Sequence, residues 1–215
     1  YAVTGEQQYA RTAAVLLDVL AESFHTSHGP IVDYPGRSHG RLNRPGYQVG
    51  RALRDFTNAA DLIWSSGVLD KASGAHPKMS IKEHVAEHMM INGADFIWRN
   101  MRGGVGETEK ARYDRIFHNG TGDYNEGLLA VGSLLGLDVG YVNWALDGPV
   151  SLQNFLSNTV FRDGQYYETA TMYQVSFIDW AELAYHVESD QYPDGLNVYD
   201  NSRFIDLNVY GPRRF

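Results

Sequence analysis

Hydrophobic residues recur every three or four positions over most of this chain, the spacing that gathers them on one face of an α-helix. The clearest such stretches are 7–24, 47–64 and 81–101. Ser80 directly precedes the third stretch and Glu83 lies three positions later, so the pair predicts a capping box at a helix start. No segment alternates apolar and polar residues for more than a few positions. The pattern therefore predicts an all-α fold.

The region 118–173 predicts helix, turn, helix, turn and helix. Residues 118–122 are too rich in Gly for a helix interior, so the first helix is expected from Tyr124 to a stop at Gly136. The second is expected over roughly 141–160, and a turn at Asp163-Gly164 precedes the third. Shorter helices are predicted over 107–117 and 201–209, which gives about eight helices in all. Successive helices joined by short turns predict antiparallel hairpins, arranged as an incomplete α/α toroid or a large bundle.

Composition narrows the possible functions. The 215 residues, of which 43% are hydrophobic and 13% aromatic, can bury one substantial core, so a single domain over 1–215 is expected. The absence of cysteine excludes disulfides and thiolate metal sites. No apolar run reaches the roughly 18 residues of a membrane span. The net charge of −8 argues against general binding of nucleic acids or anionic membranes.

One segment departs from this acidic balance. Between positions 37 and 54 the chain has five arginines, accompanied by His39, and no acidic residue before Asp55. The segment is either an exposed loop and helix start, or a rim that binds sulfate or carboxylate groups along one wall of a cleft. The arginines are Arg37, Arg41, Arg44, Arg51 and Arg54.

A longer motif lies within 119–173. Asn119 is followed at fixed spacing by Gly127 and Gly132, and Asp163-Gly164 is followed by Glu168 and then Tyr173. This pattern resembles the heparinase II/III and alginate lyase-like polysaccharide lyases. The resemblance implies an α/α toroid, an acidic polysaccharide substrate, no cofactor, and a secreted or periplasmic location. Because such lyases often continue into a C-terminal β-sandwich, it also implies that this chain is part of a longer one.

The resemblance also implies roles for individual residues. Asn119 would neutralise the uronate carboxylate, and Tyr173 would transfer protons to or from the sugar ring and the leaving oxygen. Many relatives have His directly after the Asn, where this chain has Gly120. Either His118, one position earlier, supplies the imidazole, or a His from elsewhere does so, or the site is degenerate. The side chains expected to contact substrate are Arg41, Arg44, His39, Tyr167 and Glu168.

Two other functions remain open. His84-Val85-Ala86-Glu87-His88 matches the H-x-x-E-H pattern of inverted zinc peptidases, in which the two His bind zinc and the Glu activates water. That function needs a third ligand, for which Glu168 is a candidate. Both His flank the apolar stripe of their helix, so the preferred interpretation is two hydrogen-bonded histidines at the core boundary, with no metal. The second alternative is a non-catalytic toroid that binds carbohydrate, in which Gly120 marks lost chemistry.

Overall fold

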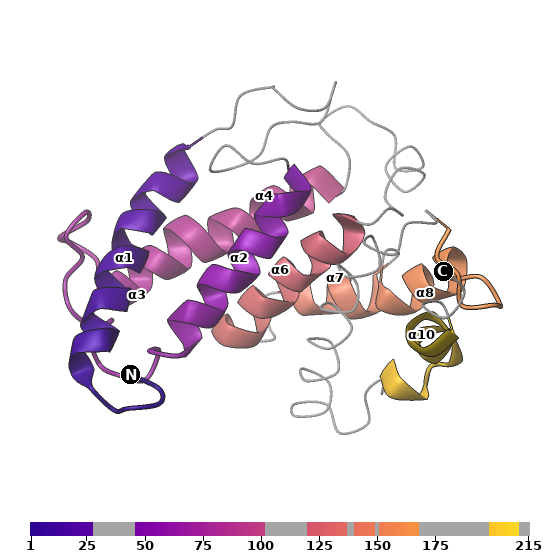
Figure 1. Cartoon of the computed structure of the whole chain (residues 1–215). Coiled ribbons are helices and arrows are strands. Elements are labelled where there is room, and N and C mark those ends of the chain that lie inside the picture. Colours follow the sequence, from indigo (N-terminus) through magenta and orange to yellow (C-terminus); the bar gives the residue numbers. More distant parts are fainter. Residues whose placement is uncertain (28–45, 102–119, 137–139, 149–150, 168–197, 211–215) are drawn as a thin grey trace. The chain divides into compact units, whose positions relative to one another are not determined.

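The computed structural model describes residues 1–27, 46–101, 120–136, 140–148, 151–167 and 198–210. These residues are mostly helical, and their only β-type pairings are the isolated bridges Ala72 with Ser80 and Val160 with Tyr166. The all-α prediction is therefore confirmed for the described part of the chain. No described helix is both long and apolar enough to cross a membrane. The chain divides into two compact units, Tyr1–Trp98 and Arg99–Phe215 (Figure 1).

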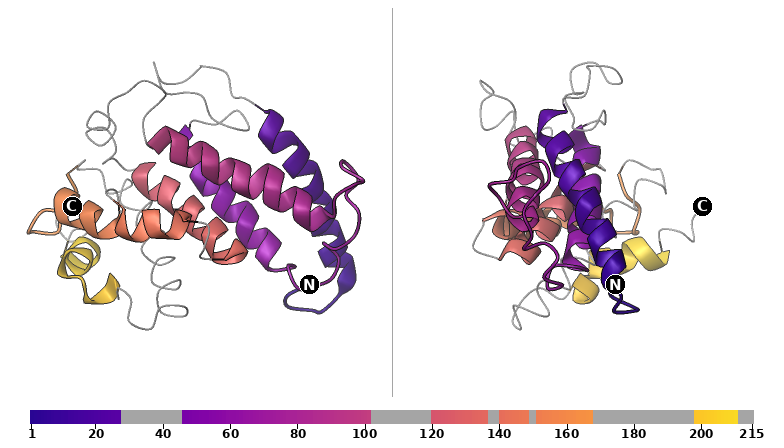
Figure 2. Two further views of the ribbon diagram at one scale, coloured as in Figure 1. Left: turned by 180° about the vertical axis from the view of Figure 1, so that it is seen from behind. Right: turned by 90° about the vertical axis from the view of Figure 1, so that its left-hand side faces the viewer.

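The first unit is built from three helical rods, and their bounds follow the predicted ones closely. They are α1 (Gln7–Thr26), α2 (Gly46–Asp61), and the uninterrupted succession α3 (Ile81–His84), η1 (Val85–Ile91) and α4 (Asn92–Met101). The middle of the third rod, η1, is π-helical, which the apolar pattern did not predict. All three rods contact one another through α1, α2 and η1, as the views in Figure 2 show.

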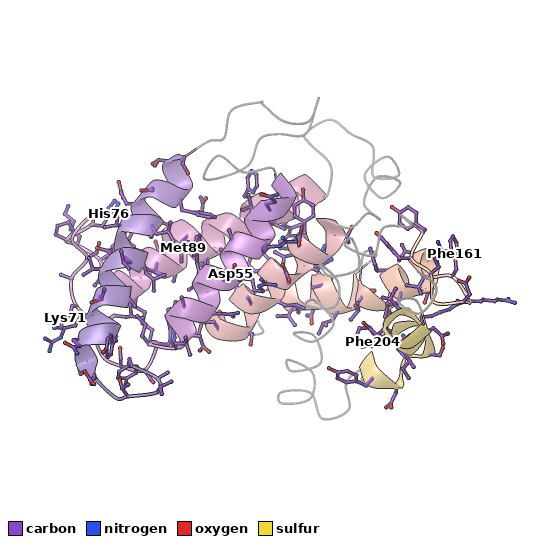
Figure 3. The ribbon with its side chains drawn as sticks, in the orientation of Figure 1. Asp55, Lys71, His76, Met89, Phe161 and Phe204 are labelled. Carbon is purple, nitrogen blue, oxygen red and sulfur yellow. The ribbon has the colours of Figure 1, made fainter. Side chains whose placement is uncertain are left out.

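Burial of one apolar stripe per rod holds this unit together. The stripes predicted in α1 and α2 are largely buried, and Met89 of η1 projects into the same interior (Figure 3). On its other face α1 exposes Val15, Leu16 and Val19. The main buried side chains are Ala10, Ala14, Leu17, Ala21, Phe24, Val49, Leu53, Ala60, Ile81, Val85, Met89, Met90, Ala94 and Ile97.

The capping box that starts the third rod is present as predicted. Ser80 Oγ accepts a hydrogen bond from the Glu83 backbone N–H at 3.1 Å, and Glu83 Oε2 accepts one from the Ser80 backbone N–H at 2.7 Å. This box fixes the point at which the turn-rich segment 62–80 becomes helix. His76 lies in that segment. The antiparallel bridge between Ala72 and Ser80 folds this part of the segment back on itself.

The second unit differs from the prediction at two helix boundaries. Its first helix, α6 (Gly120–Leu135), includes Gly120 and Gly122, although this Gly-rich stretch was expected to be non-helical. Both glycines are buried, and because glycine has no Cβ, this helix start fits into a closely packed environment. The expected single helix over 141–160 is instead two, α7 (Tyr141–Asp147) and α8 (Leu152–Thr159). A new helix begins because Ser151 Oγ accepts from the Asn154 N–H and caps it.

The last described elements complete the core of this unit. They are η4 (Val198–Asp200), α10 (Ser202–Ile205) and η5 (Asp206–Tyr210), and α10 and η5 confirm the helix predicted over 201–209. Phe204, labelled in Figure 3, and Leu207 join the core formed by α6, α7 and α8. The core residues are Leu129, Val142, Ala145, Leu146, Leu152, Phe155, Leu156, Val160, Tyr166, Phe204 and Leu207.

Candidate functional sites

Most of the predicted lyase residues lie outside the described part of the chain, as does the predicted helix over 107–117. Tyr167 is the exception. This residue is 38% exposed and its ring meets that of Tyr166 edge-on, whereas Tyr166 is fully buried and stacks on Phe155. The two neighbouring tyrosines thus differ in burial, because Tyr166 fills the core and Tyr167 is partly exposed. The predicted site residues that lie outside the described part of the chain are His39, Arg41, Arg44, His118, Asn119, Glu168 and Tyr173.

The described residues beside the motif have two informative features. The predicted turn at Asp163-Gly164 is confirmed, with Gly164 in the left-handed region at φ +79°. The N-terminal half of α6, which directly follows Asn119 in sequence, buries Asp123, Asn125 and Glu126 completely. Burying a carboxylate is costly unless it has a polar partner, so the burial of Asp123 and Glu126 requires polar partners near the start of α6.

The arginine-rich segment is only partly described. Arg54 contacts Asp55 through two hydrogen bonds, from Nε at 3.0 Å and from Nη2 at 2.9 Å. The charge of Arg54 is therefore compensated by its neighbour, and this residue is not one of the uncompensated cations that the sequence indicated. Arg37, Arg41 and Arg44 lie outside the described residues.

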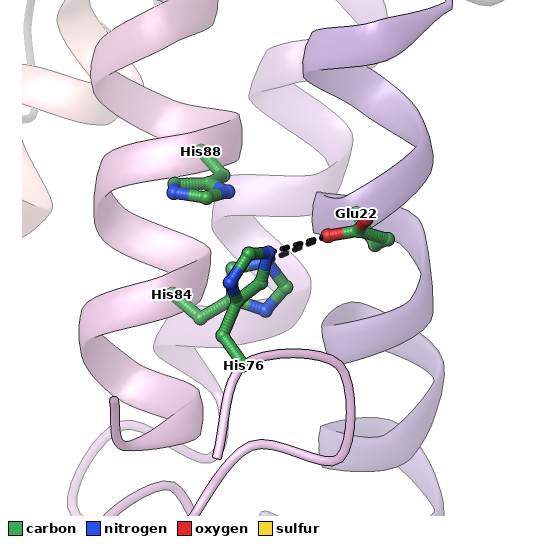
Figure 4. Close-up of side chains that lie close together, drawn as sticks. All are labelled: Glu22, His76, His84 and His88. Atoms are coloured by element: carbon green, nitrogen blue, oxygen red, sulfur yellow. Dashed lines mark hydrogen bonds and ion pairs between the residues drawn. The ribbon is translucent and has the colours of Figure 1, made fainter. Parts of the chain in front are cut away.

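A group of four metal-type donors lies in the first unit. Glu22, His76, His84 and His88 each offer one ligand atom, and these atoms all lie within 4.8 Å of one another. Figure 4 shows the two imidazoles of the third rod, that of His76 from the preceding loop, and the Glu22 carboxylate of α1 converging on one point. The His76–His84, His76–His88 and His84–His88 ring centroids are 4.5, 4.7 and 4.7 Å apart.

Each donor reaches this point for a local reason. His84 and His88 are four positions apart, which places them one turn apart on the same side of the rod. Glu22 belongs to α1, which packs against η1. His76 is held by its backbone N–H, which donates to Ser73 Oγ at 2.9 Å. Its Nε2 lies 2.7 Å from Glu22 Oε2, and His84 Nε2 lies 3.6 Å from the same oxygen.

A buried carboxylate behind the donor group orients His84. Asp18 Oδ1 lies 2.7 Å from His84 Nδ1, and Asp18 also accepts from the Ser73 hydroxyl at 2.6 Å and from the Gly74 N–H at 2.8 Å. With its proton on Nδ1, His84 directs the lone pair of Nε2 towards Glu22. That Nε2 atom is buried and has no hydrogen-bond partner among the described residues.

The environment of Asp18 keeps it ionised. Burial favours the neutral acid, but the hydrogen bonds from Ser73, His84 and Gly74 outweigh burial, and His84 adds its charge whenever its imidazole is protonated. The pKa of Asp18 therefore lies below its ordinary value of 3.8. An ionised carboxylate that accepts the Nδ1 proton fixes an imidazole in one tautomer.

The geometry agrees with one part of the zinc-peptidase alternative and not with another. His84 and His88 share one side of the rod, as that pattern predicts, but Glu87 is exposed and is not one of the four converging donors. The further donors are Glu22 and His76, while Glu168 lies outside the described residues. The expectation that both histidines lie at the core boundary is wrong for His84, which is completely buried.

Sequence reasoning missed Asp18, Glu22 and His76, although α1 carried a signal for two of them. Asp18 is an acid within an apolar stripe, and Glu22 lies one turn later. A carboxylate on the buried side of a helix needs a partner, which points to a polar site there. His76, in an irregular segment, has no comparable signal.

Comparisons of this chain with protein-family models, with curated proteins and with solved structures find no match.

Proposed function

We propose that this chain is the helical part of a polysaccharide lyase that cleaves a uronate-containing polysaccharide by β-elimination. The observation that carries the proposal is the conjunction of Asn119 and its following glycines with Asp163-Gly164, Glu168 and Tyr173 at the spacing of the lyases it resembles. The proposed architecture is an incomplete α/α toroid of antiparallel hairpins. The described contacts of α6 with α7 and of α7 with α8 support it, since successive helices pack on one another.

The reaction needs only groups that these residues offer. A base removes the proton at C5, next to the carboxylate, and the electron pair forms the C4–C5 double bond as the C4–O bond breaks. The leaving oxygen takes a proton from an acid, so neither water nor an oxidant is consumed. Asn119 suits neutralisation of the carboxylate because its amide donates hydrogen bonds without losing a proton. Tyr173 serves as the proton-transfer group, with His118 as the imidazole beside it.

Two features of the described residues support a functional role for this region. Asn119 immediately precedes the buried start of α6, with its completely buried Asp123 and Glu126. Buried ionisable groups are more frequent at functional sites than elsewhere. The Asp163-Gly164 turn that leads towards Tyr173 is held in a conformation that only Gly adopts easily.

A screen of uronate polysaccharides tests the proposal. The chain is incubated with alginate, heparan-type, hyaluronan-type and ulvan-type polymers, and the unsaturated uronate formed by β-elimination is followed by its ultraviolet absorbance. We expect a rise in absorbance with at least one polymer. Binding without any absorbance change would instead support the non-catalytic carbohydrate-binding toroid, and it would refute the lyase.

A further inference from the structure

We propose that Glu22, His76, His84 and His88 bind one divalent transition-metal ion, best matched by zinc, which crosslinks the helices of the first unit. The proposal rests on the described geometry of this unit and is independent of the lyase function. The four donors come from three segments: α1, the loop before α3, and the third rod.

The donor spacing suits a single small ion. Two ligands about 2.0–2.1 Å from a tetrahedral zinc ion are about 3.4 Å apart. The N···O separations of 2.7 Å from His76 to Glu22 and 3.6 Å from His84 to Glu22 lie on either side of this value. The largest donor separation is at most 4.8 Å, so side-chain rotations alone can close the tetrahedron.

Asp18, the buried partner of His84, occupies the position of an outer-shell residue in a metal site. Ligating histidines almost always donate their other ring N–H to a carboxylate or carbonyl, which fixes the tautomer and makes the ligating nitrogen more basic. Asp18 takes this position, and it is itself held by Ser73 and Gly74. A bound cation would also satisfy the buried Nε2 of His84, which has no hydrogen-bond partner among the described residues.

The charge balance also favours a dication. Imidazoles bind a metal ion in their neutral form, so in the metal-bound site the charge of the protein groups comes from the Glu22 and Asp18 carboxylates, about −2, which a divalent ion neutralises. Three imidazole nitrogens and one carboxylate oxygen suit zinc and its neighbours in the first transition row. Calcium and magnesium prefer shells made of oxygen.

Four protein ligands indicate a structural ion rather than a catalytic one, because structural zinc sites are closed and catalytic sites keep a position for water. The side chains of Glu22 and His76 are 46% and 37% exposed, so an ion can reach the site from solvent. His84 lies behind them at 0% exposure. The ion would join α1 to the third rod and to the intervening loop.

Metal titration of the chain, purified without a polyhistidine tag and stripped with a chelator, tests the site. Zn²⁺ affinity is measured by competition with a chromophoric chelator, and stoichiometry by elemental analysis. We expect one Zn²⁺ per chain, a higher thermal unfolding midpoint with Zn²⁺, and the visible spectrum of tetrahedral Co²⁺ when cobalt is substituted. Failure to form a one-to-one zinc complex would overturn the proposal.

Variants locate the ligands. Glu22→Gln, His76→Gln and His88→Gln change side chains that are not fully buried, and circular dichroism verifies that each variant folds. We expect each to lose more affinity than the roughly 10- to 100-fold that removal of an outer-shell partner costs, and Asp18→Asn to lose roughly that amount. Zinc should no longer raise the unfolding midpoint of His88→Gln.

Glu87→Gln is the matched control, because it changes an exposed carboxylate next to His88 that is not among the donors. We expect its zinc affinity to equal that of the parent chain. If Glu87→Gln weakens binding as much as His88→Gln does, or if the ligand variants bind like the parent, the proposed ligand set is wrong. Tyr173→Phe should leave zinc binding unchanged whatever the outcome of the lyase screen.

Discussion

At the scale of single residues, the proposed chemistry depends on one hydroxyl group. Tyr173→Phe keeps the ring and removes only the proton-transfer group, so we expect turnover to fall on the order of 10²-fold or more, with substrate binding retained. Asn119→Ala removes a donor to the developing charge and should cost roughly 3 kcal/mol in the transition state. Initial rates of unsaturated product formation measure both effects.

Tyr167→Phe and Tyr166→Phe are the controls for this substitution. Tyr167 is partly exposed and Tyr166 is buried against Phe155, so the first tests ligand contact and the second tests packing. Activity that survives Tyr173→Phe but is abolished by Tyr167→Phe would show that the catalytic role belongs to Tyr167.

A second residue-scale prediction concerns Gly164. Its φ of +79° is unfavourable for a residue with a side chain, and a Cβ there would collide with the backbone carbonyl oxygen of Asp206. We expect Gly164→Ala to lower the free energy of unfolding by about 2–5 kcal/mol, from left-handed strain and overpacking together. Chemical denaturation measures the change.

Gly140→Ala separates the two causes. Gly140 has the same φ of +79°, but no described heavy atom lies within 4 Å of the Cβ it would gain. This variant should therefore show only the strain, about 1–2 kcal/mol. Equal losses in the two variants would mean that the contact with Asp206 does not contribute.

At the scale of elements, α6 and α7 approach closely at Gly132. A Cβ at this position would overlap Val142 Cγ2. Gly132→Ala should destabilise through overpacking, about 1–3 kcal/mol, partly offset by about 1 kcal/mol of helix propensity. In Gly132→Ala/Val142→Ala the overlap is absent, so the double variant should lose less stability than the sum of the single ones. Strict additivity in this double-mutant cycle would contradict the close packing.

The capping box gives a second element-scale prediction. Ser80→Ala should lower the free energy of unfolding by about 1 kcal/mol, because the Glu83 N–H loses its partner. The backbone and side-chain hydrogen bonds from Ser80 hold the pKa of Glu83 below its ordinary value of 4.5. The stability that comes from the ionised Glu83 is therefore present above that value and is lost as the pH falls through the lowered pKa.

Glu83→Gln tests this pH dependence, since Gln keeps an acceptor but does not titrate. Between about pH 6 and about pH 3 the unfolding midpoint of the parent chain should fall further than that of the variant. Parallel pH profiles of the two unfolding midpoints would show that protonation of Glu83 does not change the stability of the protein. Both proteins are measured after removal of metal, so that histidine ligation does not enter the comparison.

At the scale of the whole molecule, the negative net charge of the chain opposes binding of the proposed anionic substrate. A chain with a net charge of −8 repels a polyanion, so binding needs a local basic segment. Arg41→Ala/Arg44→Ala should weaken binding of a uronate polymer and reduce its dependence on salt. Affinity measured at several ionic strengths reports both changes, with Arg11→Ala, an exposed cation of α1, as the control. An affinity equal to the parent's at every ionic strength would remove this role.

The sequence by itself determined the helical class, the bounds of the three rods of the first unit, the capping box at Ser80, and the turn at Asp163-Gly164. These features depend on residues within a few positions of one another, where helical periodicity and local hydrogen bonds decide the conformation. The sequence also placed His84 and His88 on one side of a helix. It failed at Gly120 and at Gly148, where burial and a new cap changed the helix boundaries.

Only the tertiary structure joined Glu22 and His76 to those histidines and placed Asp18 behind His84. The Asp18–His84 and Glu22–His76 contacts span 66 and 54 positions. Contacts over such separations follow from how helices pack, and the hydrophobic effect that drives packing is non-directional, so no local pattern specifies them. The packing of the helices therefore decided the geometry of the donor group, because a ligand set exists only when separate elements bring their side chains to one point.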